Sequence, residues 1–167
     1  SQNPWVRALC QISGATQTEI NEETVGFYFG PRLNAIGRLG DAMPGVEFLL
    51  SEDDESATAF AKQLNEKNQE RKGIVEAITK QAMEQIESNE HMKDALVHVV
   101  AGEGWNAGVV GIVASRLVEK YYRPTIVLAI DREKGIAKGS ARSIEGFHLF
   151  NELAKNREIL PHFGGHP

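Results

Sequence analysis

Apolar positions divide the chain into a helical first part and a second part that contains strands. A short helix is predicted over residues 5–12, where apolar residues recur every three or four positions and Gly14 stops the pattern. A second short helix is predicted over residues 21–30, with Pro31 breaking it. The Pro44-Gly45 pair that follows predicts a turn.

The longest periodic segment covers residues 53–89, in which Gly73 is the one glycine and proline is absent. Its apolar stripe is thin and lapses between Leu64 and Ile74. A long helix that is polar nearly all round usually joins two bodies, so one continuous linking helix is predicted. A helical hairpin bent at Gly73 and a coiled coil are the alternatives. The apolar positions are Phe60, Leu64, Ile74, Ala77, Ile78, Ala82 and Ile86.

After Met92 the pattern changes to strand, helix, strand, strand and helix, which predicts an α/β layer domain with a mixed sheet. The second and third strands are close enough in sequence to form a hairpin. The predicted strands cover residues 95–101, 125–130 and 134–143, and the predicted helices cover residues 107–122 and 148–155.

Composition favours a folded cytoplasmic protein. The chain has 41% hydrophobic residues, and its apolar runs stay far below the ~18 residues that span a bilayer. Residues 1–10 lack the pattern of a signal peptide. Cys10 stands alone among apolar neighbours, which favours a buried inert thiol over a nucleophile. Because Ser1 is not an initiator Met and residues 162–167 stop within a glycine turn, the chain is expected to be an internal fragment.

Charge is distributed unevenly along the chain, whose net charge is −5. Residues 47–103 carry 6 basic against 13 acidic residues, whereas residues 105–167 carry 9 basic against 6 acidic ones. The overall acidity argues against strong nonspecific binding of nucleic acid. The C-terminal part is nevertheless able to hold an anion locally.

Two glycine-containing stretches depart from ordinary core or surface patterns. Residues 30–40, GPRLNAIGRLG, combine two arginines and an amide with glycines, which fits a phosphate contact and equally a surface loop with solvated arginines. Residues 104–117, GWNAGVVGIVASRL, follow a strand and open a helix, so their N–H groups could hold an anion. Close packing of the small residues against the sheet is the favoured interpretation of this second stretch.

Two further stretches offer donors to a phosphate. In GSARS, residues 139–143, Ser140 and Arg142 are two positions apart on a strand and point to the same face. An edge strand with a solvated arginine is the alternative. In FGGH, residues 163–166, two glycines expose N–H groups beside His166, a weak signal by itself.

The remaining titratable residues carry no assigned role. His91 lies in a polar linker and His98 on a strand. Neither cysteine and histidine nor aspartate and histidine are spaced as in a zinc or two-metal site. No catalytic residue and no metal ligand is therefore assigned.

Taken in order, these stretches resemble the RecJ family of bacterial single-stranded-DNA-specific exonucleases, within the DHH phosphoesterase superfamily. The resemblance covers essentially the whole chain. It is carried by GPRLNAIGRL from Gly30, WNAGVVGIVASRL from Trp105, YRPT from Tyr122, GSARS from Gly139 and FGGH from Phe163.

The resemblance implies three parts. Residues 1–46 would be a short helical remnant of the DHH catalytic domain, and residues 47–92 the long connecting helix region. Residues 93–167 would be the α/β, mixed-sheet DHH-associated domain that binds substrate, truncated at its C-terminal side. The family's catalytic domain holds two divalent metals, manganese or magnesium. Its Asp-His-His signature is absent from this chain, so no cofactor is expected here and the fragment alone is expected to be inactive.

The resemblance also implies a set of substrate contacts. Arg32, Asn34 and Arg38 would touch DNA near the domain junction. Ser140 and Arg142 would hold a 5′-terminal phosphate, and Gly164, Gly165 and His166 would lie nearby. Asn106 stands where many relatives have His, so it receives no role. The set is Arg32, Asn34, Arg38, Ser140, Arg142, Gly164, Gly165 and His166.

The implied activity is 5′-to-3′ digestion of single-stranded DNA in DNA repair and recombination. The implied partner is single-stranded DNA with a 5′ phosphate, bound by a monomer away from any membrane, with a single-strand-binding protein or a helicase as further partners. Two alternatives stay open: another DHH phosphoesterase, such as an oligoribonuclease or nucleotide phosphatase, and a non-catalytic nucleic-acid-binding module. The latter would not need a 5′-phosphate pocket.

Overall fold

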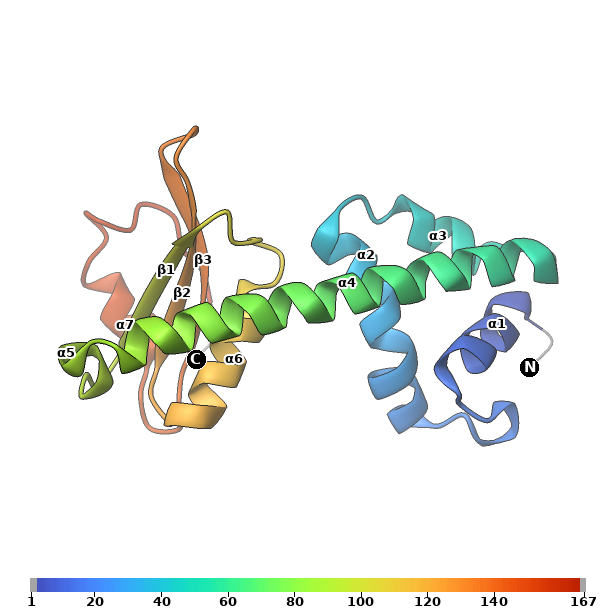
Figure 1. The fold of residues 1–167 in the computed structure, drawn as a ribbon, viewed down its shortest axis with the longest axis horizontal. Helices are drawn as coiled ribbons and strands as arrows, with labels where there is room; N and C mark the ends of the chain where they lie inside the picture. Colours follow the sequence, from blue (N-terminus) through green and yellow to red (C-terminus); the bar gives the residue numbers. More distant parts are fainter. Residues whose placement is uncertain (1–2, 166–167) are drawn as a thin grey trace. The chain divides into compact units, whose positions relative to one another are not determined.

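The computed structural model describes residues 3–165. The chain forms two compact units, divided in sequence between Ile74 and Val75, and each is described by itself. Helices make up the first unit, whereas the second contains a three-stranded sheet with helices around it (Figure 1). Within the described range, no helix combines the length and the apolar character needed to cross a membrane.

Helix α1, Pro4–Ser13, is delimited by sequence signals at both ends. Pro4 lies in the first turn, where N–H groups have no partner within the helix, so its missing N–H costs nothing. Gly14 ends the helix with a left-handed φ of 76°, and its N–H donates to the carbonyl oxygen of Cys10. The helix predicted over residues 5–12 is confirmed.

The next helical segment shows that the predicted break at Pro31 is wrong. A π-helical stretch, η2, Thr24–Phe29, continues directly into α2, Gly30–Leu39. Pro31 is accepted because it lies in the first turn of α2. A Cβ at position 30 would lie only 3.1 Å from the carbonyl oxygen of Val25, so the junction favours glycine. The GPRLNAIGRL stretch is therefore a helix and not a loop.

Pro44 and Gly45, predicted as a turn, lie instead within helix α3, Met43–Leu49. Asp41 accounts for the start of this helix, because its Oδ1 accepts the backbone N–H of Met43 at 3.0 Å. Pro44 then occupies the first turn, as prolines often do. The same pair of residues is thus compatible with a turn and with a helix start, and the preceding aspartate favours the helix.

The core of the first unit is formed by residues of α1, η2, α2 and α3 and of the first turns of α4, Asp54–Glu87. Phe48 is a fully buried side chain at its centre, and Trp5 packs edge-on against it with the ring centroids 6.4 Å apart. The buried members are Val6, Ala8, Leu9, Cys10, Phe29, Ile36, Phe48, Ala57, Ala61 and Leu64.

Helix α4 is continuous through Gly73, so one long helix is confirmed and the hairpin alternative is wrong. The helix begins after Asp53, whose carboxylate accepts the N–H of Ser56 at 2.7 Å. Hydrogen bonds from this first turn hold the pKa of Asp53 below its usual value. The boundary between the two compact units falls inside α4, which therefore contributes residues to both.

One side of α4 is buried in a pattern that apolar residues alone do not reveal. Between Leu64 and Val75, Asn68 is the one buried residue, and its polarity explains why the apolar stripe lapses there. Val75 is fully buried although it was not among the predicted apolar positions, whereas Ala77, which was, is exposed. The predicted stripe therefore had the right period but the wrong phase around residue 75.

The second unit contains a mixed sheet with strand order β1-β2-β3, as predicted. β1 and β2 are parallel and are joined through helix α6, because parallel neighbours need a crossover connection. β2 and β3 are antiparallel and form a hairpin. The elements are α5 (Glu90–Lys93), β1 (His98–Glu103), α6 (Val110–Tyr121), β2 (Thr125–Asp131), β3 (Ile136–Arg142) and α7 (Leu149–Ala154).

Some details of this order differ from the prediction, among them the start of α6 at Val110 rather than at residue 107. β1 begins at His98 rather than at residue 95, and Leu96 before it is 80% exposed. The short helix α5 was not predicted, because four residues are too few to show a helical period. Its N-cap is Asn89. The Asn89 side chain accepts N–H groups of His91 and Met92, which fixes the start of this turn of helix.

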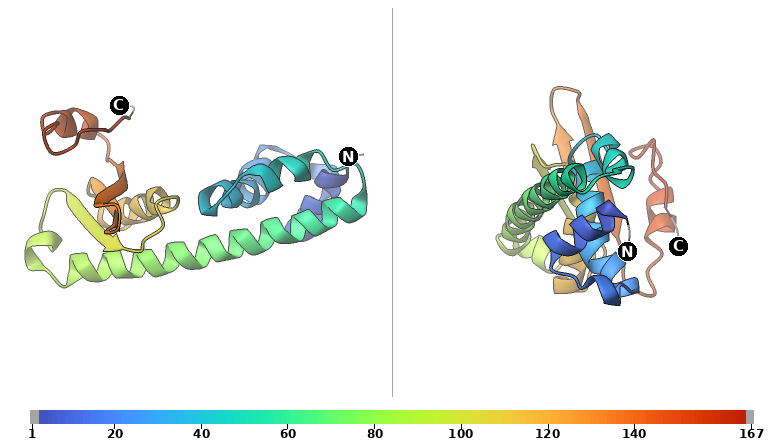
Figure 2. Two further views of the ribbon diagram at one scale, coloured as in Figure 1. Left: turned by 90° about the horizontal axis from the view of Figure 1, so that it is seen from above. Right: turned by 90° about the vertical axis from the view of Figure 1, so that its right-hand side faces the viewer.

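The second half of α4 closes the β1 edge of the sheet (Figure 2). The Gln85 side chain donates to the carbonyl oxygen of Ala101 at 2.8 Å and accepts its N–H at 3.3 Å, so it pairs with the strand as another strand would. One turn earlier, Gln81 accepts the indole N–H of Trp105 at 2.7 Å. The Trp105 ring lies so close to Gly102 that a Cβ there would be 2.1 Å from it.

His98 is buried at the start of β1 without a hydrogen-bond partner for either ring nitrogen in the described chain. Its ring stands edge-on to Tyr121, with centroids 5.2 Å apart. Tyr121 and Lys120 in turn donate to the Glu87 carboxylate at 2.6 and 2.9 Å. Burial, followed by the nearby positive charge of Arg123, lowers the pKa of His98 and so favours the neutral ring.

We expect Gln85→Leu to lower the free energy of unfolding by about 1 to 3 kcal/mol, because it leaves the Ala101 N–H and C=O unpaired. Urea unfolding measures the loss, and hydrogen exchange at the Ala101 amide should accelerate. Gln69→Leu, at an exposed position of the same helix, is the control. Equal losses for both variants would show that the pairing does not stabilise the sheet edge.

Stability of the second unit should fall with acidification because of His98. Since its folded pKa is lowered, this contribution is intact above the unfolded pKa of ~6.5 and is lost as the pH falls from there towards the folded pKa. His98→Phe, which keeps an aromatic ring, should flatten the profile between about pH 6.5 and 5. Parallel profiles for wild type and His98→Phe would exclude His98 as the cause.

Candidate functional site

Ser140 and Arg142 lie on the same face of β3, as predicted. In the hairpin register they pair with Val127 and Thr125, two residues of β2 that are completely buried. Arg142 Nη1 donates to Ser140 Oγ at 3.0 Å and to the carbonyl oxygen of Ala141 at 2.8 Å. The two side chains therefore form one cluster of donors on the face that α6 covers.

The first turn of α6 lies against this cluster. A Cβ on Gly111 would be 3.0 Å from Arg142 Nη2 and 3.1 Å from Ser140 Oγ. Val109, the residue before α6, has no side-chain acceptor that could cap the helix. Within the described residues, no acceptor is found for the backbone N–H groups of Val110 and Gly111. The cluster thus faces a helix end with unused donors and the positive end of the helix dipole.

Charge at this cluster is positive and uncompensated. No carboxylate in the described chain forms an ion pair with Arg142, which donates its hydrogen bonds there to the neutral oxygens of Ser140 and Ala141. A guanidinium beside a positive helix end is unfavourable until an anion lies between them. The arrangement can therefore hold a small anion such as a phosphate, with a hydroxyl, a guanidinium and backbone N–H groups as donors.

Phe163, Gly164 and Gly165, predicted to lie in a glycine turn, are in the C-terminal segment of the same unit and form no turn there. Phe163, just before Gly164 and Gly165, packs against Phe150 with ring centroids 5.3 Å apart, and the Arg157 guanidinium lies 5.0 Å from its ring centre. No hydrogen bond or ion pair in the described chain joins the two glycines to Ser140 or Arg142. His166 lies outside the described residues.

The candidates of the first unit lie on α2 and divide between its two sides. Arg32 is half-buried, and its Nη1 donates to the Tyr28 carbonyl oxygen at 2.7 Å while its Nε donates to Asn65 Oδ1 at 3.0 Å. Burial lowers the pKa of Arg32. Asn34 and Arg38 are exposed and stand one helical turn apart. Arg32 therefore holds η2, α2 and α4 together, and the other two form an outward polar face.

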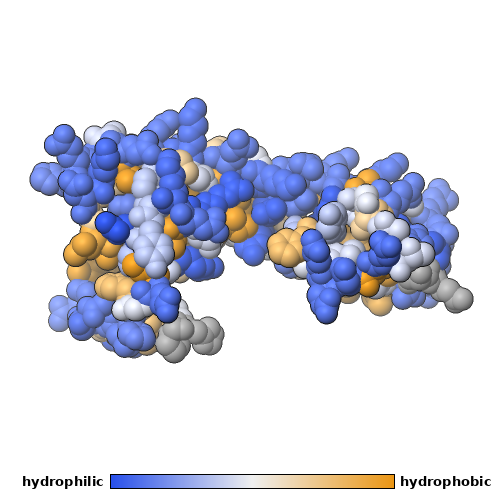
Figure 3. All heavy atoms as spheres, turned by 90° about the horizontal axis from the view of Figure 1, so that it is seen from below, coloured by the Kyte–Doolittle hydropathy of each residue, from blue (hydrophilic) through white to orange (hydrophobic). Residues whose placement is uncertain are grey.

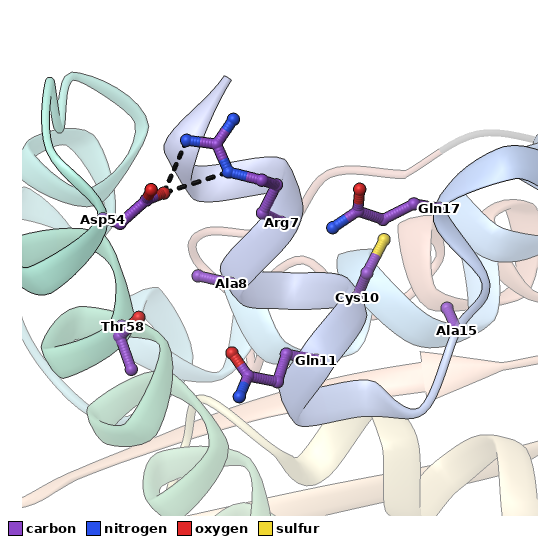
Figure 4. A pocket seen from close by; sticks show the side chains of 8 residues that line it. All are labelled: Arg7, Ala8, Cys10, Gln11, Ala15, Gln17, Asp54 and Thr58. Carbon is purple, nitrogen blue, oxygen red and sulfur yellow. Dashed lines mark hydrogen bonds and ion pairs between the residues drawn. The ribbon is translucent and has the colours of Figure 1, made fainter. Parts of the chain in front are cut away.

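A hollow of about 450 Å³ in the first unit has no chemistry of its own (Figure 4). Arg7 and Asp54 at its rim form an ion pair at 2.6 Å, so their charges compensate each other. Cys10 is buried as predicted, and burial raises the pKa of its thiol. A thiol that stays protonated is a poor nucleophile, so this hollow is not a candidate active site.

The described residues contain no group of three or more His, Cys, Asp or Glu side chains that could hold a metal ion. Residues 3–165 therefore offer no such cluster for the divalent metals, which the family resemblance implies for the catalytic domain, and no step is derived through them. The face in Figure 3 is mostly hydrophilic, with hydrophobic side chains in separate areas. The cluster around Arg142 remains the described site with the clearest chemistry.

Comparison with known proteins identifies the domain that the sheet belongs to. The family profile described as the DHHA1 domain matches residues 92–167, which include the whole sheet. RecJ, the single-stranded-DNA-specific exonuclease of Bacillus subtilis, is 54% identical over 162 residues, which are 97% of this chain and 20% of that protein. The Escherichia coli protein of the same name is 37% identical over 169 residues, covering 98% of this chain and 29% of the relative.

Solved structures of RecJ share the fold. A crystal structure of RecJ from Thermus thermophilus in complex with Mn²⁺ matches 99% of this chain and 24% of its own length, with a TM-score of 0.84 and 30% identity. A crystal structure of exonuclease RecJ bound to manganese matches 99% of this chain and 40% of its own, with a TM-score of 0.82 and 30% identity.

These matches cover nearly all of this chain, whereas the chain spans only 20% to 29% of the length of the curated relatives. The mixed sheet, the long preceding helix and the helical first unit all agree with the predicted fold class. The chain therefore belongs to the RecJ family and carries the DHHA1 domain of that family from residue 92 onward.

Proposed function

We propose that this chain is the substrate-holding part of a single-stranded-DNA-specific exonuclease, and that its DHHA1 domain binds the 5′-terminal phosphate of the DNA. The observation that carries the proposal is the cluster of Ser140, Arg142 and the first turn of α6. It combines a guanidinium with two backbone N–H groups, and within residues 3–165 the guanidinium has no carboxylate partner and the N–H groups have no acceptor.

A terminal phosphate fits this cluster better than an internal phosphodiester does. A phosphate monoester carries about −1.5 to −2 charges near pH 7 and offers three terminal oxygens, whereas a phosphodiester carries one charge. The Arg142 fork can bind two oxygens and leave the third to Ser140 or to a backbone N–H. A site that selects the 5′ end in this way would orient the first phosphodiester towards the catalytic centre.

The outward face of α2 is a second proposed contact with the DNA backbone. Asn34 and Arg38 offer an amide and a guanidinium one turn apart on an exposed helix surface. Arg32 already donates hydrogen bonds from its Nε and Nη1 within the first unit. We therefore propose that it contacts DNA through its remaining N–H groups. Gly164, Gly165 and His166 are proposed to lie near the terminal phosphate.

The setting follows from the relatives. They are named as exonucleases specific for single-stranded DNA, which supports action on single-stranded DNA. Digestion from 5′ to 3′ in DNA repair and recombination, in the cytoplasm and by a monomer, is part of the proposal. Solved RecJ structures contain Mn²⁺ or Mg²⁺, which supports metal-dependent hydrolysis by the full-length protein. A single-strand-binding protein or a helicase is proposed as a further partner.

Removing the Arg142 guanidinium should reduce kcat/KM for 5′-phosphorylated single-stranded DNA by roughly 10- to 150-fold in a full-length RecJ polypeptide that carries this sequence. One charge-assisted hydrogen bond contributes on the order of 1.5–3 kcal/mol, and about 1.4 kcal/mol corresponds to tenfold. Arg142→Lys should restore only part of the lost kcat/KM, because lysine keeps the positive charge but lacks the planar fork of the guanidinium. DNA with a 5′-hydroxyl should be a poor substrate for both enzymes.

Arg132→Ala is the matched control, since it removes the same charge from the same unit at a residue already paired with Glu103. Arg132→Ala should leave unchanged the ratio of kcat/KM for 5′-phosphorylated DNA to kcat/KM for 5′-hydroxyl DNA. If Arg142→Ala slows digestion of the phosphorylated and hydroxyl substrates equally, Arg142 does not bind a terminal phosphate. It then stabilises the fold or contacts the DNA backbone without regard to the 5′ end.

The chain by itself should bind DNA without cutting it. Incubation with 5′-phosphorylated single-stranded DNA and Mn²⁺ should release no nucleotides, because the described residues contain no metal-ligand cluster. A full-length RecJ polypeptide in the same buffer is the positive control. Metal-dependent release of mononucleotides that persists through repeated purification would overturn this expectation.

A further inference from the structure

Gly111 lies in the first turn of α6 at a position where a side chain would collide with the proposed phosphate donors. A Cβ there would be 3.0 Å from Arg142 Nη2 and 3.1 Å from Ser140 Oγ, with Ser140 Cβ next at 3.5 Å. The atoms nearest to the missing methyl group are therefore the two donor atoms that the site offers to a ligand.

Neither the backbone nor the helix accounts for a glycine at this position. Gly111 does not have the positive φ that favours glycine, in contrast to Gly104, whose φ is 69°. Alanine forms helices better than glycine does. The glycine also differs from Gly102 and Gly139, where a Cβ would come within 2.1 and 2.5 Å of packed side chains. At those two positions substitution would damage the fold, whereas at Gly111 it would press on the flexible end of an arginine and on a hydroxyl.

We infer that Gly111 is a positioning residue that gives the site its selectivity for a terminal phosphate. This rests on the proposed binding of the 5′ phosphate by Arg142 and Ser140. The absence of a side chain lets the guanidinium lie over the first turn of α6, within reach of an anion that also accepts the Val110 and Gly111 N–H groups. A methyl group on residue 111 displaces the fork by a few tenths of an ångström and covers the helix end.

The consequence is specific to the terminal phosphate. Displacing the Arg142 fork weakens bidentate contact with a dianionic phosphate but does not touch the exposed face of α2. Gly111→Ala should therefore weaken binding of 5′-phosphorylated DNA on the order of 10-fold, the lower range for a lost charge-assisted hydrogen bond. Binding of the same DNA with a 5′-hydroxyl should stay as it was. The melting temperature should not fall, since alanine is the better helix former.

The test measures dissociation constants of the 167-residue chain for one oligodeoxynucleotide with a 5′ phosphate or a 5′ hydroxyl, together with thermal melts. The variants are Gly111→Ala, Arg142→Ala and their combination. Gly73→Ala is the matched control, because Gly73 is also helical and a Cβ there meets nothing within 4 Å. If Gly111 acts through Arg142, most of the effect of Gly111→Ala should disappear when Arg142 is already alanine.

The outcomes separate this inference from the function on which it rests. A selective loss in Gly111→Ala, absent from Gly73→Ala and largely absent in the Arg142→Ala background, supports it. If Arg142→Ala abolishes the phosphate preference while Gly111→Ala keeps it, the inference fails and the proposed function stands. If wild type binds both oligonucleotides equally, both fail. An equal loss for both oligonucleotides with a lower melting temperature gives Gly111 a packing role only and also overturns the inference.

Discussion

The close approach of α6 to β3 is the constraint on which the site depends. The antiparallel register places Ser140 and Arg142 opposite the buried Val127 and Thr125, so both side chains face the helix. Because Gly111 has no side chain, their polar ends lie against the first turn of α6. A positive side chain beside a positive helix end is unfavourable in isolation and becomes favourable with an anion present. The same packing of α6 on the sheet therefore creates the proposed site.

The sheet is in turn fixed by polar contacts with α4. Gln85 pairs with the backbone of Ala101 at the β1 edge, and Gln81 accepts the indole N–H of Trp105, whose ring packs over Gly102. These contacts orient the segment that leads from β1 into α6. A displaced α6 would move Gly111 away from Arg142, so the amides on α4 support the site without touching a ligand.

Local sequence signals predicted much of the fold, and long-range contacts account for what they missed. Periodicity identified α1, α4 and the mixed sheet, and the two-residue spacing of Ser140 and Arg142 predicted their shared face. Pro31 was misjudged because a proline that breaks a helix and one that opens the first turn look alike in sequence. The roles of Asn68 and Gly111 depend on which element packs against them, which no pattern within a single element reveals.

The most direct test of the central claim is an NMR titration of the chain with a short 5′-phosphorylated oligodeoxynucleotide and its 5′-hydroxyl counterpart. We expect the amide protons of Val110 and Gly111 and the Arg142 side-chain N–H signals to shift downfield with the phosphorylated ligand and to stay in place with the other. Shifts of equal size with both ligands, or shifts confined to residues outside α6 and β3, would contradict a terminal-phosphate site at this helix end.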